Sequence, residues 1–181
     1  MTTSAWRATE EDLLRTPDDG FKHELVDGEI RMSPAGTRHG LMSLKLTSRL
    51  LAYVEQQGLG HVLDSRTGFR MPGGNVRCPD VGFVARGRFE GDKVPEGFSA
   101  VPPDLAVEVV SPDDRPRYVF DKIGEYLGAG VRLVWVVDAA GRVATVYRSL
   151  TNVRRLEQHE MLEGEDVVPG FRCPLVDVLV P

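Results

Sequence analysis

The stretch V-P-P-D-L-A-V-E-V-V-S-P-D-D-R-P-R-Y-V-F-D-K-I-G-E-Y-L, residues 101–127, decides the fold of this chain. Its pattern predicts a buried strand, a short turn and a helix. The strand, Leu105 to Val110, is apolar on both faces, which is typical of a central strand that is covered on either side. Glu108 is the one exception. An ionised carboxylate in such a strand costs on the order of several kcal/mol unless it is paired or holds a metal ion.

A second acid and a lysine occupy informative positions on either side of this strand. Asp80 follows Pro79 and opens the apolar run Val81-Gly82-Phe83-Val84, and Lys122 lies in the helix after Glu108. Taken singly, each acid has an ordinary interpretation, because a strand glutamate is often half of an ion pair and Pro-Asp is common in turns. Two carboxylates at one level of a sheet, with an ammonium nearby, instead favour a divalent-metal site with a charge partner.

These residues resemble the motif of the PD-(D/E)XK nuclease superfamily, in the order Pro79-Asp80, then Glu108-Val-Val, then Lys122. Four longer blocks, also in order, are similar to the Uma-type family of bacterial restriction-endonuclease-like proteins. The blocks are H-E-L-V-D-G-E-I at 23–30, S-P-A-G-T-R-H-G at 33–40, P-P-D-L-A-V-E-V-V-S-P at 102–112 and G-V-R-L-V-W-V-V-D at 130–138. The likeness extends from about Phe21 to Leu179.

The resemblance implies an α/β fold with a restriction-endonuclease-like central mixed β-sheet flanked by α-helices. It implies Mg²⁺ or Mn²⁺ as cofactor, with Asp80 and Glu108 as metal ligands and Glu24 as a third carboxylate contributing to the site. The chain departs from the superfamily at one position, since Val110 stands two residues after Glu108, where a lysine is usual. In the resemblance, Lys122 on the following helix takes over that role.

A helix of roughly twenty residues is predicted after Gly36, ending near Gly58. The apolar residues that recur at helical spacing are expected to face the sheet, namely Leu41, Leu44, Leu51 and Val54. Arg38 and His39 stand at its start, where cations oppose the helix dipole. We therefore expect them to bind an anion such as a phosphate. A purely structural role for His39 is the alternative.

The helix that follows the central strand carries an apolar arc that is expected to pack on the sheet. The arc consists of Val119, Phe120, Ile123, Tyr126 and Leu127. Lys122 lies at its edge, about 40° from Tyr126 at ~100° per residue, so its ammonium can reach past the end of the strand. Arg115 lies on nearly the same line and is the competing cation. Because a helix connects them, Leu105–Val110 and Leu133–Val137 are predicted to be parallel neighbours.

Length and composition fit one domain that spans residues 1–181. The chain is 41% hydrophobic and 27% charged, which is enough material for a single core. No apolar run reaches ~18 residues, and the N-terminus lacks a basic segment followed by an apolar one, so neither a membrane span nor a secretory signal is predicted. Two cysteines, Cys78 and Cys173, make neither a disulfide framework nor a metal cluster. We expect a cytoplasmic protein.

The predicted function is Mg²⁺-dependent endonucleolytic hydrolysis of DNA. Phosphodiester hydrolysis needs an activated water, neutralised phosphoryl charge and a stabilised leaving oxygen. A hard divalent cation held by two carboxylates and a backbone carbonyl, that of Val109, meets these needs. The net charge of −5 argues against non-specific coating of DNA but is compatible with basic residues gathered on one face. A homodimer is expected, because cutting two antiparallel strands suits a two-fold arrangement.

Two other functions remain open from the sequence. A catalytically inactive PD-(D/E)XK-like module that binds nucleic acid or a protein is favoured by Val110 in the usual lysine position. A metal-dependent phosphohydrolase acting on a smaller ester is favoured by the acidic net charge. Steep loss of duplex affinity with added salt would separate the DNA-binding functions from the phosphohydrolase.

Overall fold

The centre of the fold is a six-stranded mixed β-sheet with the strand order β10-β9-β8-β7-β6-β3. The structure is a computed structural model that describes residues 6–33, 36–112 and 114–179. Within the sheet, β7 and β8 run parallel and the other neighbouring pairs run antiparallel. The strands are β3 (Gly60–Leu63), β6 (Val81–Ala85), β7 (Leu105–Val110), β8 (Leu133–Asp138), β9 (Val143–Tyr147) and β10 (Val153–Glu157). The predicted central mixed sheet is confirmed.

The two interior strands β7 and β8 are parallel neighbours, as their unbroken apolar sequences predict. Their register pairs Leu105 with Leu133 and Glu108 with Val136. Five of the six residues in each strand are buried. Helices therefore cover this part of the sheet on both faces, which removes the apolar side chains of both strands from water.

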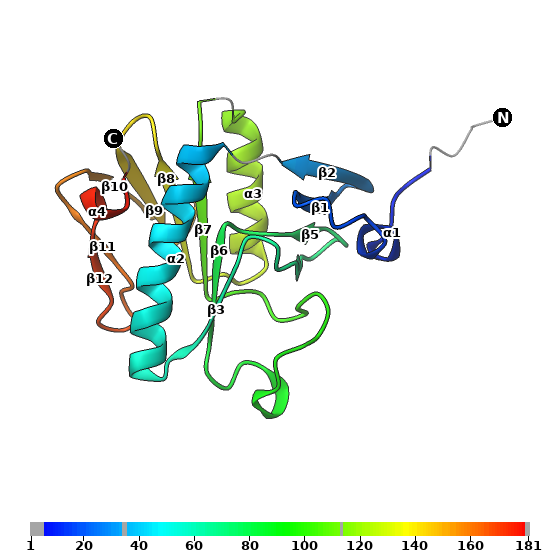
Figure 1. The fold of residues 1–181 in the computed structure, drawn as a ribbon, viewed down its shortest axis with the longest axis horizontal. Helices are drawn as coiled ribbons and strands as arrows, with labels where there is room; N and C mark the ends of the chain where they lie inside the picture. The colour runs from blue at the N-terminus through cyan, green and yellow to red at the C-terminus, as the bar shows by residue number, and fades with distance from the viewer. Residues whose placement is uncertain (1–5, 34–35, 113, 180–181) are drawn as a thin grey trace.

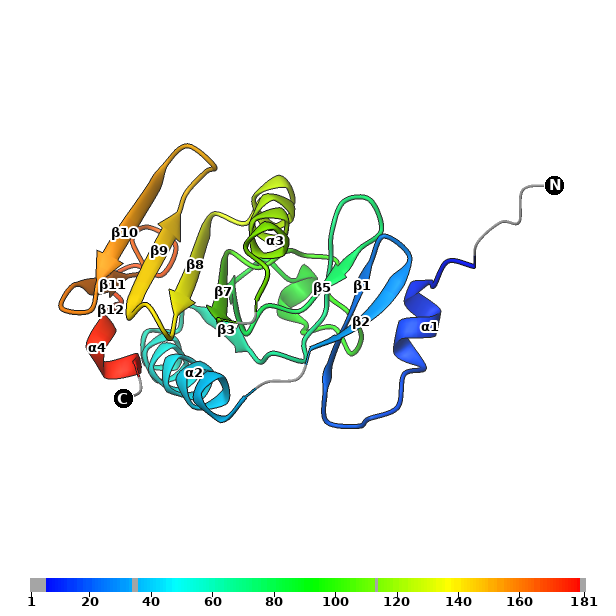
Figure 2. The same cartoon turned by 90° about the horizontal axis from the view of Figure 1, so that it is seen from above.

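Helices α2 (Thr37–Gln57) and α3 (Pro116–Gly128) lie on opposite faces of the central sheet, as Figures 1 and 2 show. The buried residues of α2 are Met42, Leu46, Leu50 and Val54. Of the four residues predicted to face the sheet, Val54 does so, but Leu41, Leu44 and Leu51 are exposed, Leu44 to 65%. The prediction of this face was wrong because apolar residues recur at helical spacing on more than one side of α2.

Helix α3 packs on the other face of the sheet through Lys122, Ile123 and Tyr126. Phe120, predicted to belong to the apolar arc, is 51% exposed. Pro116 is the first helical residue, where its missing N–H is not needed. The helix ends at Gly128, and Gly130 adopts φ +93°, a left-handed conformation that glycine tolerates.

A second, four-stranded sheet packs beside the central sheet, with the strand order β2-β1-β5-β4 (Figure 2). Its strands are β1 (Lys22–Val26), β2 (Glu29–Ser33), β4 (Phe69–Arg70) and β5 (Val76–Arg77). Asp27-Gly28, a dipeptide typical of hairpin turns, connects β1 to β2, with Asp27 at φ +53° and Gly28 at φ +81°. Ahead of it lies α1 (Glu10–Leu14), which Thr9 caps.

The C-terminal region adds a short hairpin and a final helical turn to the α2 side of the core. The hairpin consists of β11 (Met161–Glu163) and β12 (Arg172–Pro174), and α4 (Leu175–Val178) follows it. A 3₁₀ turn, Glu90–Asp92, interrupts the long connection between β6 and β7. Among the described helices, none combines the length and apolarity that a membrane crossing requires.

Candidate active site

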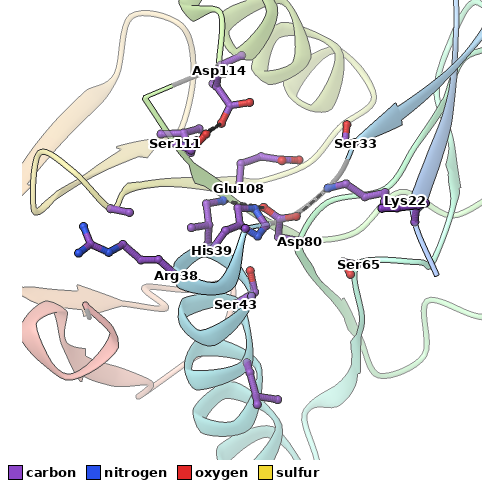
Figure 3. A pocket seen from close by; sticks show the side chains of 18 of the residues that line it. Lys22, Ser33, Arg38, His39, Ser43, Ser65, Asp80, Glu108, Ser111 and Asp114 are labelled. Carbon is purple, nitrogen blue, oxygen red and sulfur yellow. Dashed lines mark hydrogen bonds and ion pairs between the residues drawn. The ribbon is translucent and has the colours of Figure 1, made fainter. Parts of the chain in front are cut away.

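Asp80 lies one residue before β6, at one end of the central sheet. Its buried carboxylate is held by three groups. Oδ1 accepts a hydrogen bond from Lys22 Nζ at 2.7 Å, and Oδ2 accepts the backbone N–H of Val109 at 2.8 Å. His39 Nε2 lies 3.0 Å from the same Oδ2 (Figure 3). Strands β1 and β7 and helix α2 therefore all meet at this one carboxylate.

Glu108 lies in β7 and points to the α3 face of the sheet. Its Oε1 accepts a hydrogen bond from the Tyr126 hydroxyl at 2.6 Å and forms an ion pair with Lys122 Nζ at 2.9 Å. Within the described residues, Oε2 accepts no hydrogen bond. The carboxylate in the apolar strand is thus paired, as its burial demands, and the pairing leaves one oxygen available.

Lys122 bridges two buried carboxylates, because its Nζ also lies 3.1 Å from Glu24 Oε1. Glu24 comes from β1, and every side of its carboxylate is engaged. Oε1 accepts the backbone N–H of Cys78 at 2.7 Å, and Oε2 accepts the Tyr118 hydroxyl at 3.1 Å and Arg77 Nη1 at 3.4 Å. Glu24 therefore supports Lys122 from behind and does not line the cavity that Asp80 and Glu108 enter.

The buried charges shift one another's pKa values in opposite directions. Burial alone would raise the pKa of Glu24, but the positive charges of Lys122, Lys22 and Arg77 outweigh it and lower the value to about 2. The pKa of Asp80 is also lowered, since Lys22 and the hydrogen bond with His39 outweigh burial.

Glu108 behaves differently from the other two acids. Burial raises its pKa above the usual value, and the neighbouring carboxylates of Asp80 and Glu24 add to this effect, so Lys122 and Lys22 compensate only partly. Burial alone would lower the pKa of Lys122. The surrounding carboxylates, Glu108 above all, outweigh burial and raise that pKa above its usual value. The site therefore keeps an ammonium ion in a dry environment, next to the carboxylate most ready to accept a proton.

A cavity of about 890 Å³ opens over these groups, and Asp80, Glu108 and Lys122 all line it. Helix α2 contributes Arg38 and His39 to the wall, and in Figure 3 the Arg38 side chain extends away from Asp80 while His39 approaches it. The predicted competitor of Lys122, Arg115, is exposed at the start of α3 and is not part of the wall. Lys122 is therefore the α3 cation that the fold brings to the acids.

Several residues of the site were not predicted. The sequence pattern indicates only that Lys22 is the first residue of a hairpin strand and that Tyr126 belongs to an apolar arc. The pairing of Arg77 with Glu125, at 2.5 and 2.8 Å, links β5 to α3 behind Glu24. The period-two spacing of Lys22 and Glu24 was the available signal, because it places both side chains on one face of β1.

The residue types at the cavity suit a hard divalent cation. Such ions prefer carboxylate and carbonyl oxygens, which Asp80 and Glu108 provide. The N–H of Val109 points to Asp80, and the carbonyl of a strand residue points to the same side as its N–H, so that carbonyl is a further donor. His39 Nδ1 and Ser43 Oγ are buried without a hydrogen-bond partner in the described part of the chain, as expected beside a site that takes up polar ligands or water.

In this arrangement, however, the carboxylates of Asp80 and Glu108 are already paired with the ammonium groups of Lys22 and Lys122. Within residues 6–33, 36–112 and 114–179, no three His, Cys, Asp or Glu side chains are grouped so that they could hold a metal ion. The donor types fit Mg²⁺ or Mn²⁺, but Asp80 would have to exchange a cationic partner, such as Lys22, to bind such an ion.

The fold matches that of a solved crystal structure. A crystal structure titled as a putative nuclease belonging to DUF820, from Anabaena variabilis ATCC 29413, superposes with a TM-score of 0.81 at 19% sequence identity, and the match covers 94% of this chain and 96% of that chain. The likeness confirms the predicted α/β fold, a central mixed sheet flanked by helices. No curated protein matches the chain.

The sequence itself shows the family. The family model Uma2, described as "Putative restriction endonuclease", matches residues 10–176. The chain belongs to the Uma2 family. The resemblance seen in the sequence motifs is thereby confirmed, and it extends over nearly all of the described residues.

Proposed function

We propose that this chain, acting as one domain over residues 1–181, is a divalent-metal-dependent endonuclease that hydrolyses DNA phosphodiester bonds. One observation carries the proposal. Asp80, Glu108 and Lys122, from three separate segments of the chain, meet at one end of the central sheet on the wall of a single cavity. Buried charges are costly, and a structural role alone would be served as well by apolar side chains of similar volume.

Asp80 and Glu108 are the proposed ligands of Mg²⁺ or Mn²⁺. When bound, such an ion activates water, neutralises charge on the phosphoryl oxygens and stabilises the leaving oxygen. Lys122 keeps its proton because Glu24 and Glu108 flank it, so it serves as a hydrogen-bond donor and positive charge toward the scissile phosphate. Glu24 is a positioning residue that acts through Lys122. A homodimer, suited to cutting two antiparallel strands, belongs to the same proposal.

His39 and Arg38 are proposed to contact the phosphate backbone from the start of α2. The hydrogen bond with Asp80 raises the pKa of His39, so it carries positive charge more readily than an exposed histidine. Arg115, exposed at the start of α3, is proposed to make a more distant contact with the DNA backbone. Such contacts fix the position of DNA without reading its sequence.

The decisive experiment measures metal binding and cleavage on the same set of variants. Wild-type protein, Asp80→Asn, Glu108→Gln and the control Asp121→Asn, an exposed acid on α3, are titrated with Mn²⁺ by calorimetry and incubated with supercoiled plasmid and Mg²⁺. We expect the first two variants to bind Mn²⁺ at least tenfold more weakly and to lose cleavage, and the control to behave as wild type.

Two results would contradict the proposal. Equal Mn²⁺ affinity in all four proteins would place the ion elsewhere. A wild type that binds Mn²⁺ but cuts no plasmid with either ion would favour the non-catalytic binding module. That alternative has one specific observation in its support, namely that lysines neutralise both carboxylates and the site is electrostatically complete with no ion bound.

A further inference from the structure

The two lysines at the candidate active site are paired differently. The chain has four lysines, Lys22, Lys45, Lys93 and Lys122, and the first and last of these lie here. Each pairs with one of the proposed metal ligands, Lys22 with Asp80 and Lys122 with Glu108. Lys122 has Glu24 as a second carboxylate partner, whereas in the described part of the chain Asp80 is the carboxylate that pairs with Lys22.

Lys22 is also the more accessible of the two. It reaches Asp80 from β1 in the second sheet (Figure 3), whereas Lys122 belongs to α3, which packs on the central sheet. Its side chain is 12% exposed, against 6% for Lys122, and it lines the cavity. Its flexible four-carbon stem allows the ammonium to swing to a new partner without movement of the backbone.

Metal coordination by Asp80 competes directly with Lys22. The ammonium donates to Asp80 Oδ1 at 2.7 Å, so a divalent ion that takes this oxygen removes the hydrogen bond and repels the positive charge. Lys122 remains neutralised by Glu24 if Glu108 coordinates the ion. Lys22 loses its carboxylate partner, and the anion that enters the same cavity is the substrate phosphate.

We propose that Lys22 is a substrate-binding residue that changes partner, from Asp80 in the metal-free protein to a non-bridging oxygen of the DNA phosphate once Asp80 coordinates a divalent ion. This inference rests on the proposed metal site at Asp80 and Glu108. It assigns two effects to one side chain: Lys22 weakens metal binding and strengthens binding of DNA to the metal-loaded protein.

The first test is metal affinity, with Lys22→Met as the variant and Lys93→Met, at an exposed loop position, as the matched control. Removal of the competing ammonium is expected to tighten Mn²⁺ binding about tenfold, the equivalent of one hydrogen bond to a charged group. The variant leaves Asp80 without its ammonium, so it is expected to unfold at a lower temperature than wild type, and Mn²⁺ should raise its Tm by more than it raises the wild-type Tm.

The second test is affinity for a 30-base-pair duplex, measured by fluorescence anisotropy with Ca²⁺ in place of Mg²⁺ to limit cleavage, and again with EDTA. With Ca²⁺, we expect Lys22→Met to bind the duplex about tenfold more weakly than wild type does. In EDTA the difference from wild type should be smaller, because there Lys22 is paired with Asp80 in the wild type. The slope of log affinity against log salt should fall by about 0.9 with Ca²⁺, as for one lost phosphate contact.

The outcomes separate this inference from the proposed function. If wild type binds Mn²⁺ through Asp80 but Lys22→Met changes neither Mn²⁺ affinity nor the Ca²⁺-dependent part of DNA affinity, Lys22 is a structural ion-pair partner and the inference is wrong. Weaker Mn²⁺ binding in Lys22→Met would also overturn it. If wild type binds no Mn²⁺ through Asp80, the proposed metal site itself fails, and the inference fails with it.

Discussion

Replacement of Lys122 by methionine is the perturbation whose size the structure predicts most directly. Methionine keeps most of the stem packing and removes the charge that lies 2.9 Å from Glu108 and 3.1 Å from Glu24. Glu24 retains Arg77, a tyrosine hydroxyl and a backbone N–H, so the loss falls mainly on Glu108, whose remaining hydrogen bond comes from Tyr126. Breaking a buried ion pair in this way costs about 3–5 kcal/mol of unfolding free energy.

The cost should depend on pH in a defined direction. The pKa of Glu108 is already raised in the folded protein, and loss of Lys122 raises it further. A carboxyl whose folded-state pKa lies above its unfolded value contributes stability at low pH and loses it as pH rises through the folded value. The free energy of unfolding of Lys122→Met should therefore lie furthest below that of wild type at pH 8. This difference should shrink as the pH is lowered and Glu108 takes up a proton.

Urea unfolding followed by circular dichroism, without metal, at pH 8 and pH 5.5 measures this effect. The control Lys93→Met should stay within about 0.5 kcal/mol of wild type. In the double variant Lys122→Met/Glu108→Gln, a neutral glutamine replaces the carboxylate that Lys122→Met alone leaves unpaired. The losses of unfolding free energy should therefore be less than additive by about 1–3 kcal/mol. A cost below about 1 kcal/mol, no change with pH, or full additivity would each refute the reasoning.

Two further predictions concern the packing of α2 and the acid stability of the site. Met42→Ala should lower the free energy of unfolding in urea by about 2–5 kcal/mol, because Met42 is buried against the sheet. Leu44→Ala, at an exposed position, should stay within about 0.5 kcal/mol of wild type. Similar losses in the two variants would mean that α2 packs through another face. Because the folded-state pKa of Glu24 is lowered to about 2, wild type should exceed Glu24→Gln in stability at pH 7 by about 3 kcal/mol, and this margin should vanish between about pH 5 and pH 2. A margin that is constant over this range would show that Glu24 is not the ionised partner of Lys122.

The parts of the site that were predictable are those with a local signature. A glutamate inside an otherwise apolar strand is costly, so Glu108 stands out from its neighbours without any knowledge of the fold, and Asp80 does so at the start of another apolar run. Lys122 follows from the helix register, because its position is fixed relative to Ile123 and Tyr126 once the helix is recognised. The strand β7, the helix α3 and the turn at Asp27-Gly28 were predictable for the same reason.

The tertiary structure decided what depends on neighbours distant in sequence. Helix α2 carries apolar residues on more than one side, and which of Met42 and Leu44 is buried is fixed by the sheet beneath, not by spacing. The role of Lys22 is decided in the same way, since a lysine on an edge hairpin is ordinary until the second sheet packs beside the central one and brings it to Asp80, fifty-eight positions away. Periodicity along a chain reports which residues share a face, whereas the partner of that face is set by long-range packing.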